Sequence, residues 1–155
     1  MRVLHVQKAK GIGGSEQHLL TLLPGLSRAG DDVRLMVLAA GEDEARFICA
    51  AGDAGIDVVS VPAGADADPR VTLALDREIR RFAPDVVHTH LVHADLWGQI
   101  AARRSGVAGV RSAHNVSARY RSEPGRSAGR LAGRLARRSI AISEHVAAYE
   151  LKEIG

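Results

Sequence analysis

The sequence is poor in cysteine, in aromatic residues and in long apolar runs, and each shortage excludes a class of protein. Cys49 is the only cysteine among 155 residues, so no internal disulfide can form and a reducing compartment is expected. Its apolar helical surroundings predict a buried thiol. Two phenylalanines, two tyrosines and one tryptophan are too few for an aromatic surface that stacks nucleic-acid bases.

Charge and hydropathy exclude further classes. The net charge of +3 is too small for a general polyanion binder, and no apolar run approaches the length of a membrane span. A strand pattern begins at Arg2, which is unlike a secretory signal. With 46% hydrophobic residues to build a core, we expect one globular domain in the cytoplasm and no nucleic-acid partner.

The chain does have a glycine-rich loop between a strand pattern and a helix pattern. The stretch from Lys8 to Glu16 follows a short apolar run and precedes leucines at helical spacing. Such a junction exposes unpaired amides at a helix start, where the helix dipole also attracts an anion. Gly13 and Gly14 allow a ligand to approach the backbone closely. We interpret the loop as a contact for the diphosphate of an activated donor, and the alternative is a tight turn without a ligand.

Two well-known phosphate-binding loops do not fit this stretch. A dinucleotide fingerprint requires a glycine where this chain has Glu16, and an acidic residue after the second strand, where the sequence is Ala39-Ala40-Gly41. The Gly-Lys-Ser/Thr sequence of a P-loop is missing. Nicotinamide binding and ATP hydrolysis are therefore disfavoured.

Six strand patterns alternate with six helix patterns along the chain. The strands are predicted at residues 2–7, 33–39, 56–61, 85–89, 107–113 and 140–142. The helices are predicted at about residues 15–29, 42–54, 71–82, 94–104, 127–138 and 143–154. Ser15 is expected to cap the first helix, and Pro24 to kink or break it.

The alternation predicts an α/β, Rossmann-like, doubly wound parallel sheet with helices on both faces. Its short strands are apolar throughout, which is typical of buried parallel strands, and right-handed crossovers favour the strand order 3-2-1-4-5-6. Ligands of such sheets bind at the carboxyl ends of the strands. This topology brings three distant stretches together: the glycine loop, residues 88–93 and residues 114–115.

Histidines gather at these predicted strand ends. Four of the seven are His88, His90, His93 and His114. His88 and His5 fit structural histidines inside strands, whereas His90, at the strand's exit, fits a side chain that hydrogen-bonds a sugar. A metal site is disfavoured because no carboxylate or thiolate stands at a fixed spacing from them.

A basic stripe marks the fifth predicted helix. Arg126, Arg130 and Arg134 recur every four residues, and Leu131 and Leu135 stand on the neighbouring face. One interpretation is a solvated face beside a buried leucine seam. The other is contact with an anionic lipid or a phosphorylated acceptor, which would make the protein peripheral on the cytoplasmic face of a membrane.

Six short motifs, taken in order, resemble the opening half of family 4 glycosyltransferases of the GT-B fold. They are residues 13–16 (GGSE), 30–33 (GDDV), 85–90 (DVVHTH), 94–98 (ADLWG), 112–115 (SAHN) and 140–144 (IAISE). Each motif is loose alone, and the set covers nearly the whole chain.

The resemblance implies a site and a reaction. In this family the N-terminal domain mainly holds the acceptor and a second domain binds the nucleotide-sugar. The amides of Gly13 and Gly14 would approach the donor diphosphate, and His90 would contact a sugar near the reacting carbon. The acceptor side would be lined by Ser15, Glu16, His114 and Asn115. Transfer would retain the anomeric configuration, need no metal and rely on amide donors to stabilise the leaving diphosphate.

The family continues into a donor-binding domain beyond a segment like residues 151–155. We therefore expect this chain to be the acceptor-side half, with a donor-binding domain or a separate chain as its partner and little or no transfer activity alone. No cofactor is expected apart from the nucleotide-sugar substrate. The acceptor is a sugar, a lipid or a glycan, which the sequence leaves open. The alternative is a non-catalytic module on the same scaffold that binds a sugar or a nucleotide.

Overall fold

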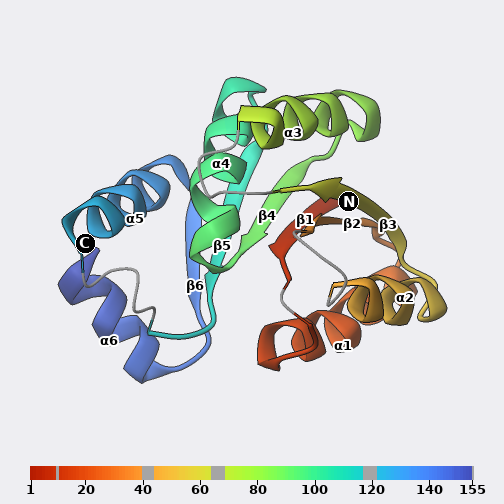
Figure 1. Ribbon diagram of the computed structural model, residues 1–155, viewed down its shortest axis with the longest axis horizontal. Helices are drawn as coiled ribbons and strands as arrows, with labels where there is room; N and C mark the ends of the chain where they lie inside the picture. The colour runs from red at the N-terminus through yellow and green to blue at the C-terminus, as the bar shows by residue number, and fades with distance from the viewer. Residues whose placement is uncertain (10, 40–43, 64–68, 117–121, 155) are drawn as a thin grey trace.

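A six-stranded parallel sheet with the order β3-β2-β1-β4-β5-β6 forms the centre of the computed structural model (Figure 1). The structure describes residues 1–9, 11–39, 44–63, 69–116 and 122–154. The strands are β1 (Arg2–Lys8), β2 (Asp32–Ala39), β3 (Asp57–Pro62), β4 (Val86–His90), β5 (Ala108–Ala113) and β6 (Arg138–Ala141). The predicted Rossmann-like fold class and strand order are confirmed.

Helices cover the sheet in two layers. They are α1 (Gly14–Arg28), α2 (Ala45–Asp53), α3 (Pro69–Phe82), α4 (Leu91–Arg104), α5 (Glu123–Leu135) and α6 (Glu144–Glu153). Figure 1 shows α1 and α2 on one face of the sheet, with α3 and α4 on the other. This division follows from right-handed crossovers, because the connection that leads to β4 reverses the direction in which strands are added.

Each layer encloses its own apolar cluster, because successive residues of a strand point to opposite faces. Under α3 and α4, Leu4 packs with Leu75 and Val87. Under α1 and α2, Leu35 packs with Phe47. All of these side chains are buried. The central strands are thus buried on both faces, which explains their nearly continuous apolar runs.

The boundary of the first helix differs from the prediction. Its N-cap is Gly13 rather than Ser15, and the amide of Gly13 donates to the Glu16 carboxylate over 3.1 Å. Glu16 therefore satisfies a free amide at the helix start, as a capping carboxylate does. The helix also runs through Pro24 without a break.

Two other boundaries move, and two side chains lie differently from prediction. Helix α4 begins at Leu91, three residues early, because β4 passes into it without a loop. Helix α5 begins four residues before its predicted start, and the predicted start of the second helix at Glu42 lies outside the described residues. Cys49 is exposed, and so is Leu131, which does not belong to a buried seam.

Among the described residues, no helix combines the length and the apolar character that a membrane crossing requires.

A glycine in α4 allows the helix to pack closely against β4. A Cβ added at Gly98 would lie 2.3 Å from Cγ2 of Thr89, whose side chain is fully buried. We expect Gly98→Ala to lower the free energy of unfolding by about 1–3 kcal/mol, because the buried contact cannot yield. Urea unfolding measures this change.

The matched control is Gly52→Ala in α2. A Cβ at Gly52 meets no atom within 4 Å, so the alanine is expected to stabilise the protein by about 0.5–1 kcal/mol. Equal effects of the two substitutions would contradict close packing of α4 on β4.

Candidate functional site

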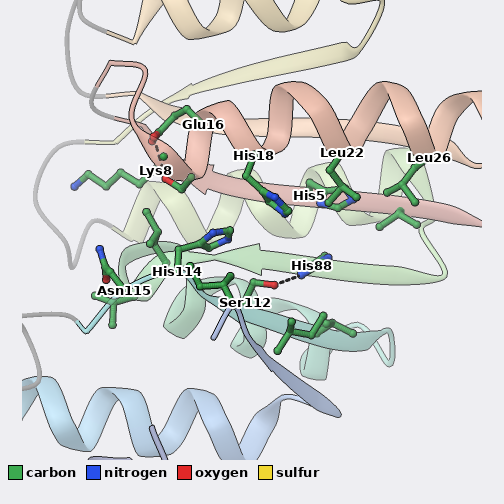
Figure 2. Close-up of a pocket in the computed structure, with 18 of the residues that line it drawn as sticks. His5, Lys8, Glu16, His18, Leu22, Leu26, His88, Ser112, His114 and Asn115 are labelled. Atoms are coloured by element: carbon green, nitrogen blue, oxygen red, sulfur yellow. Dashed lines mark hydrogen bonds between the residues drawn. The ribbon is translucent and has the colours of Figure 1, made fainter. Parts of the chain in front are cut away.

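A cavity of about 1190 Å³ opens between α1 and the strands β4, β5 and β6 (Figure 2). Its polar lining includes Lys8, Gly13, Gly14, Ser15, Glu16, His18, His88, His93, Ser112, His114 and Asn115. Its apolar lining includes Val3, Leu22, Leu26, Val86, Val110, Ile140 and Ile142. The polar residues from the three predicted stretches therefore line one cavity, as the topology predicted.

On this face of the sheet, α1 packs against β2 and α2 against β3, while residues of β4 and β5 line the cavity. Helix α1 packs beside β1 and presents His18, Leu22 and Leu26 at intervals of about one turn (Figure 2). The opposite wall comes from β4 and β5, where alternate residues such as His88 and Ser112 face the same side. His18, whose role was left open by the sequence, is exposed and lines the cavity from α1.

A buried carboxylate organises the glycine loop. Glu16, 6% exposed, accepts hydrogen bonds from the amide of Gly13 at 3.1 Å and the hydroxyl of Ser15 at 2.9 Å. The side-chain amide of Gln7 donates to its other oxygen over 2.9 Å. Glu16 thus places a negative charge at the start of α1, where a bound anion would also be stabilised.

This arrangement limits how the loop can bind a diphosphate. The amide of Gly13 reaches an external anion only if the Glu16 carboxylate moves away, since that oxygen occupies the acceptor position. Gly14 is exposed and lines the cavity without this contact. Diphosphate binding by Gly13 and Gly14 stays a prediction, and so does a role for Ser15 and Glu16 in acceptor binding.

His90 is buried where exposure was expected, and His88 lines the cavity where burial was expected. His90, predicted to emerge at the strand's exit, is fully buried and is not among the residues that line the cavity. His88, expected to be a core residue satisfied by the backbone, lines the cavity and shares a 2.8 Å hydrogen bond with the Ser112 hydroxyl. The contact of His90 with a sugar stays a prediction; in the structure, His90 contacts His114, which lines the cavity.

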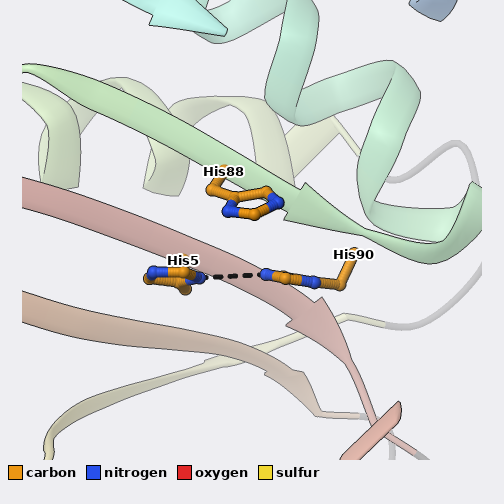
Figure 3. A group of neighbouring side chains, drawn as sticks. All are labelled: His5, His88 and His90. Atoms are coloured by element: carbon orange, nitrogen blue, oxygen red, sulfur yellow. Dashed lines mark hydrogen bonds between the residues drawn. The ribbon is translucent and has the colours of Figure 1, made fainter. Parts of the chain in front are cut away.

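His90 is bonded to a histidine at each of its ring nitrogens. Its Nε2 lies 2.9 Å from Nδ1 of His5 (Figure 3), and its Nδ1 lies 3.1 Å from Nε2 of His114. His114 is half-buried and lines the cavity beside Asn115, which is exposed. Both residues are therefore placed where a ligand in the cavity would contact them.

Burial keeps these imidazoles uncharged near neutral pH. Desolvation is the largest cause of each shift, and it lowers the pKa of His5 to about 3 and that of His88 to about 4. It also lowers the pKa of His90 well below its usual value, and neighbouring histidines add to the effect. The pKa of His114 is lowered as well. A ligand therefore meets neutral hydrogen-bonding groups.

The same histidines are the candidate ligands for a metal. His5, His88 and His90 each offer a nitrogen, and these atoms lie within 4.8 Å of one another. Ligand nitrogens at zinc bond lengths of about 2.0–2.1 Å in a tetrahedron stand roughly 3.4 Å apart. The nitrogens of His5 and His90 are closer, at 2.9 Å, because they share a proton. Metal binding would require that hydrogen bond to break, and the expectation of no metal stays a prediction.

Backbone strain lies beside the cavity. Leu91, which lines it, has φ of 65°, a left-handed conformation that is uncommon for a residue with a branched side chain. The conformation arises where β4 turns directly into α4 at His90. Strain of this kind costs about 1–3 kcal/mol and clusters at functional sites.

The arginine stripe of α5 is separate from the cavity. Arg126, Arg130 and Arg134 are not among its lining residues. Arg126 forms an ion pair with Glu123, and Arg130 lies 3.9 Å from the same carboxylate. Arg134 is exposed. Glu123 offsets part of the positive charge, and contact of this stripe with an anionic lipid or phosphate stays a prediction.

Two features near the cavity were missed by sequence reasoning. The register pairs His5 with His88 across β1 and β4, so a histidine assigned to structure joins the group at the cavity. Arg111 is buried in β5 and lies 3.2 Å from the Asp95 carboxylate. A charged residue inside an otherwise apolar strand, paired with an acid on the next helix, was the available signal.

Comparison with known families gives one match over most of the chain. The model described as "Glycosyltransferase Family 4" matches residues 12–155. A comparison with curated protein sequences finds no match.

Solved structures share the fold. A crystal structure of HepE from Anabaena in complex with UDP and glucose aligns with 20% sequence identity and a TM-score of 0.79, over 100% of this chain and 41% of that chain. A putative UDP-N-acetylglucosamine 2-epimerase from Listeria monocytogenes aligns with 13% identity and a TM-score of 0.75, over 98% and 42%. The apo lipopolysaccharide outer core galactosyltransferase WaaB aligns with 12% identity and a TM-score of 0.73, over 99% and 42%. The chain thus spans about two fifths of the length of these proteins.

Proposed function

Because the chain belongs to glycosyltransferase family 4, we propose that it is the acceptor-binding half of a retaining, metal-independent transferase. Such an enzyme moves a sugar from a nucleotide-sugar to a sugar, lipid or glycan acceptor. A second, donor-binding domain or chain completes the site, and the described chain alone has little or no transfer activity. The reaction takes place in the cytoplasm and serves glycan biosynthesis.

The observation that carries the proposal is the cavity on one face of the sheet, which reaches the carboxyl ends of β1, β4 and β5. It is lined by the glycine loop on one side and by His114 and Asn115 on the other, although these stretches lie far apart in sequence. Open parallel sheets bind ligands at the carboxyl ends of their strands. The neighbour HepE was solved with UDP and with UDP-glucose, which supports a nucleotide-sugar as the donor. The epimerase neighbours share the fold alone, so the family match decides in favour of transfer.

The side chains present at the cavity suit hydroxyl recognition. The neutral imidazole of His114 and the amide of Asn115 can donate to or accept from sugar hydroxyls without a charge to desolvate. Gly14 is exposed at the start of α1, where helix amides favour an anion, and this supports a contact of its amide with a phosphoryl oxygen. The buried His90 holds the His114 ring through a hydrogen bond of 3.1 Å between His90 Nδ1 and His114 Nε2.

Nuclear magnetic resonance titration tests the proposed site. Glucose, used as a probe of the acceptor side, is expected to shift the amide resonance of His114, whereas UDP is expected to shift those of the glycine loop alone. His114→Ala is expected to weaken glucose binding by about fivefold to tenfold, since one hydrogen bond contributes roughly 1 kcal/mol, and to leave UDP binding unchanged.

The matched control is His145→Ala, because His145 is exposed on α6 and is not among the cavity's lining residues. It is expected to leave both affinities unchanged. Shifts that avoid the cavity, or an equal effect of the two substitutions, would contradict the proposed site. Sustained transfer of radiolabelled glucose by this chain alone would contradict its role as an incomplete half.

A further inference from the structure

Three histidines form a continuous hydrogen-bonded row from the centre of the sheet to the cavity wall. His5 comes from the middle of β1, His90 from the end of β4, and His114 from the residue after β5. The separations are 2.9 Å from His5 Nδ1 to His90 Nε2 and 3.1 Å from His90 Nδ1 to His114 Nε2. Figure 3 shows the first of these contacts, with the His88 ring lying over it.

The two hydrogen bonds cannot be oriented independently. A neutral imidazole carries one N–H and one bare nitrogen, so His90 must donate to one neighbour and accept from the other. One arrangement runs outward: His5 donates to His90, His90 donates to His114, and His114 carries its own proton at Nδ1. The other runs inward, and His114 then has a bare Nδ1. The tautomer of His5, at the buried end, therefore determines the tautomer of His114, at the cavity.

The buried end favours the outward arrangement. Nε2 of His5 is buried and has no hydrogen-bond partner among the described residues. In the inward arrangement this atom would carry a proton, giving a buried N–H without an acceptor, which is rarely found in folded proteins. In the outward arrangement it is a bare nitrogen, and the ring protons of His5 and His90 both form hydrogen bonds. Nδ1 of His114 likewise has no partner in the part of the chain described, so its N–H is free for a ligand.

We propose that His5 and His90 are positioning residues that hold His114 with its proton at Nδ1, so that His114 donates a hydrogen bond to a hydroxyl oxygen in the cavity. This inference rests on the proposed function for the identity of the ligand, but the relay itself exists without any ligand. It assigns a role to His5, which is buried and also lines the cavity. It also states which nitrogen of His114 meets the sugar and in which protonation state.

Long-range ¹H–¹⁵N correlation spectra of the histidine-labelled chain at pH 7.5 test the relay. The expected spectrum of the unaltered chain shows His114 protonated at Nδ1 in the large majority of molecules. His5→Leu removes the first donor and is expected to leave His114 as a mixture of both tautomers. His5→Asn restores an N–H near the original Nδ1 and is expected to return His114 to the Nδ1 form.

The control is His88→Gln, because His88 stacks on His90 at 4.3 Å between ring centroids but bonds to Ser112. It is expected to leave the His114 tautomer unchanged. His114 protonated at Nε2 in the unaltered chain overturns the relay, even if the leucine variant does not fold. An equal tautomer change in the His88 variant also overturns it.

The relay and the proposed function fail separately. A spectrum with His114 protonated at Nδ1, together with no response to glucose, supports the relay and contradicts the sugar site. Binding of glucose to a His114 protonated at Nε2 supports the sugar site and overturns the relay.

Discussion

Lowering the pH from 7 to 5 is expected to remove roughly 3–5 kcal/mol from the free energy of unfolding, because buried neutral histidines resist protonation. His5 and His88, with pKa values of about 3 and about 4, stay uncharged in the folded state at pH 5. In the unfolded chain both titrate near a pKa of 6.5 and take up protons. His90, whose pKa is also lowered, adds to the effect.

The sign follows from counting protons in the two states. Below pH 6.5 the unfolded chain binds more protons than the folded chain, so stability is complete above that pH and falls toward pH 4 and then 3. Each neutral histidine contributes a loss of about 2 kcal/mol at pH 5. Asp95 acts in the opposite direction, because burial raises its pKa to about 6. Protonation of Asp95 in the folded state offsets about 1 kcal/mol of the loss in the free energy of unfolding between pH 7 and pH 5.

Urea unfolding at pH 7, 6 and 5 measures the profile. His88→Gln is expected to reduce the loss between pH 7 and pH 5 by about 2 kcal/mol, since one neutral histidine is removed. His145→Gln serves as the control because His145 is exposed, and its profile is expected to match that of the unaltered chain. A profile that is flat between pH 7 and pH 5 would show that these imidazoles are not held neutral by burial.

The sheet order could be predicted because it depends on patterns that a sequence carries directly. Short runs of β-branched and apolar residues mark buried parallel strands, and the handedness of crossovers then leaves few arrangements. Element boundaries depend on individual contacts. Gly13 caps α1 because the Glu16 side chain folds back onto its amide. The early start of α4 depends on the positive φ of Leu91, and the periodicity of the sequence does not predict that conformation.

The location of the site could also be predicted, whereas the exposure of its side chains could not. Topology places the glycine loop near His114, since both follow the carboxyl ends of parallel strands, which lie on the same side of the sheet. His88 and His90 point to the same face of β4, and His90 is buried between His5 and His114, which the sequence does not show. The register that pairs His5 with His88, and so brings His5 into the cluster, is not visible in the sequence either.

Arg111→Met is expected to lower the free energy of unfolding by about 3–5 kcal/mol, because it leaves a buried carboxylate without its charged partner. Arg111 is 2% exposed and lies 3.2 Å from Asp95 in α4 and 2.8 Å from Glu150 in α6. The ion pairs therefore join β5 to two helices. Thr89 donates to the other Asp95 oxygen over 2.6 Å, so the acid is held in place and cannot turn toward water.

Thermal and urea unfolding measure the loss, and the matched control is Arg126→Met. Arg126 pairs with Glu123, whose side chain is 67% exposed, and exposed pairs contribute about 0–1 kcal/mol. Adding Asp95→Asn to Arg111→Met is expected to recover part of the stability, since the amide carries no charge to leave unpaired. A loss below 1 kcal/mol for Arg111→Met alone would contradict the pairing. Because β5 ends at the residue before His114, the ion pairs of Arg111 also hold His114 in position. Arg111→Met is therefore also expected to broaden the His114 resonances, while Arg126→Met leaves them sharp.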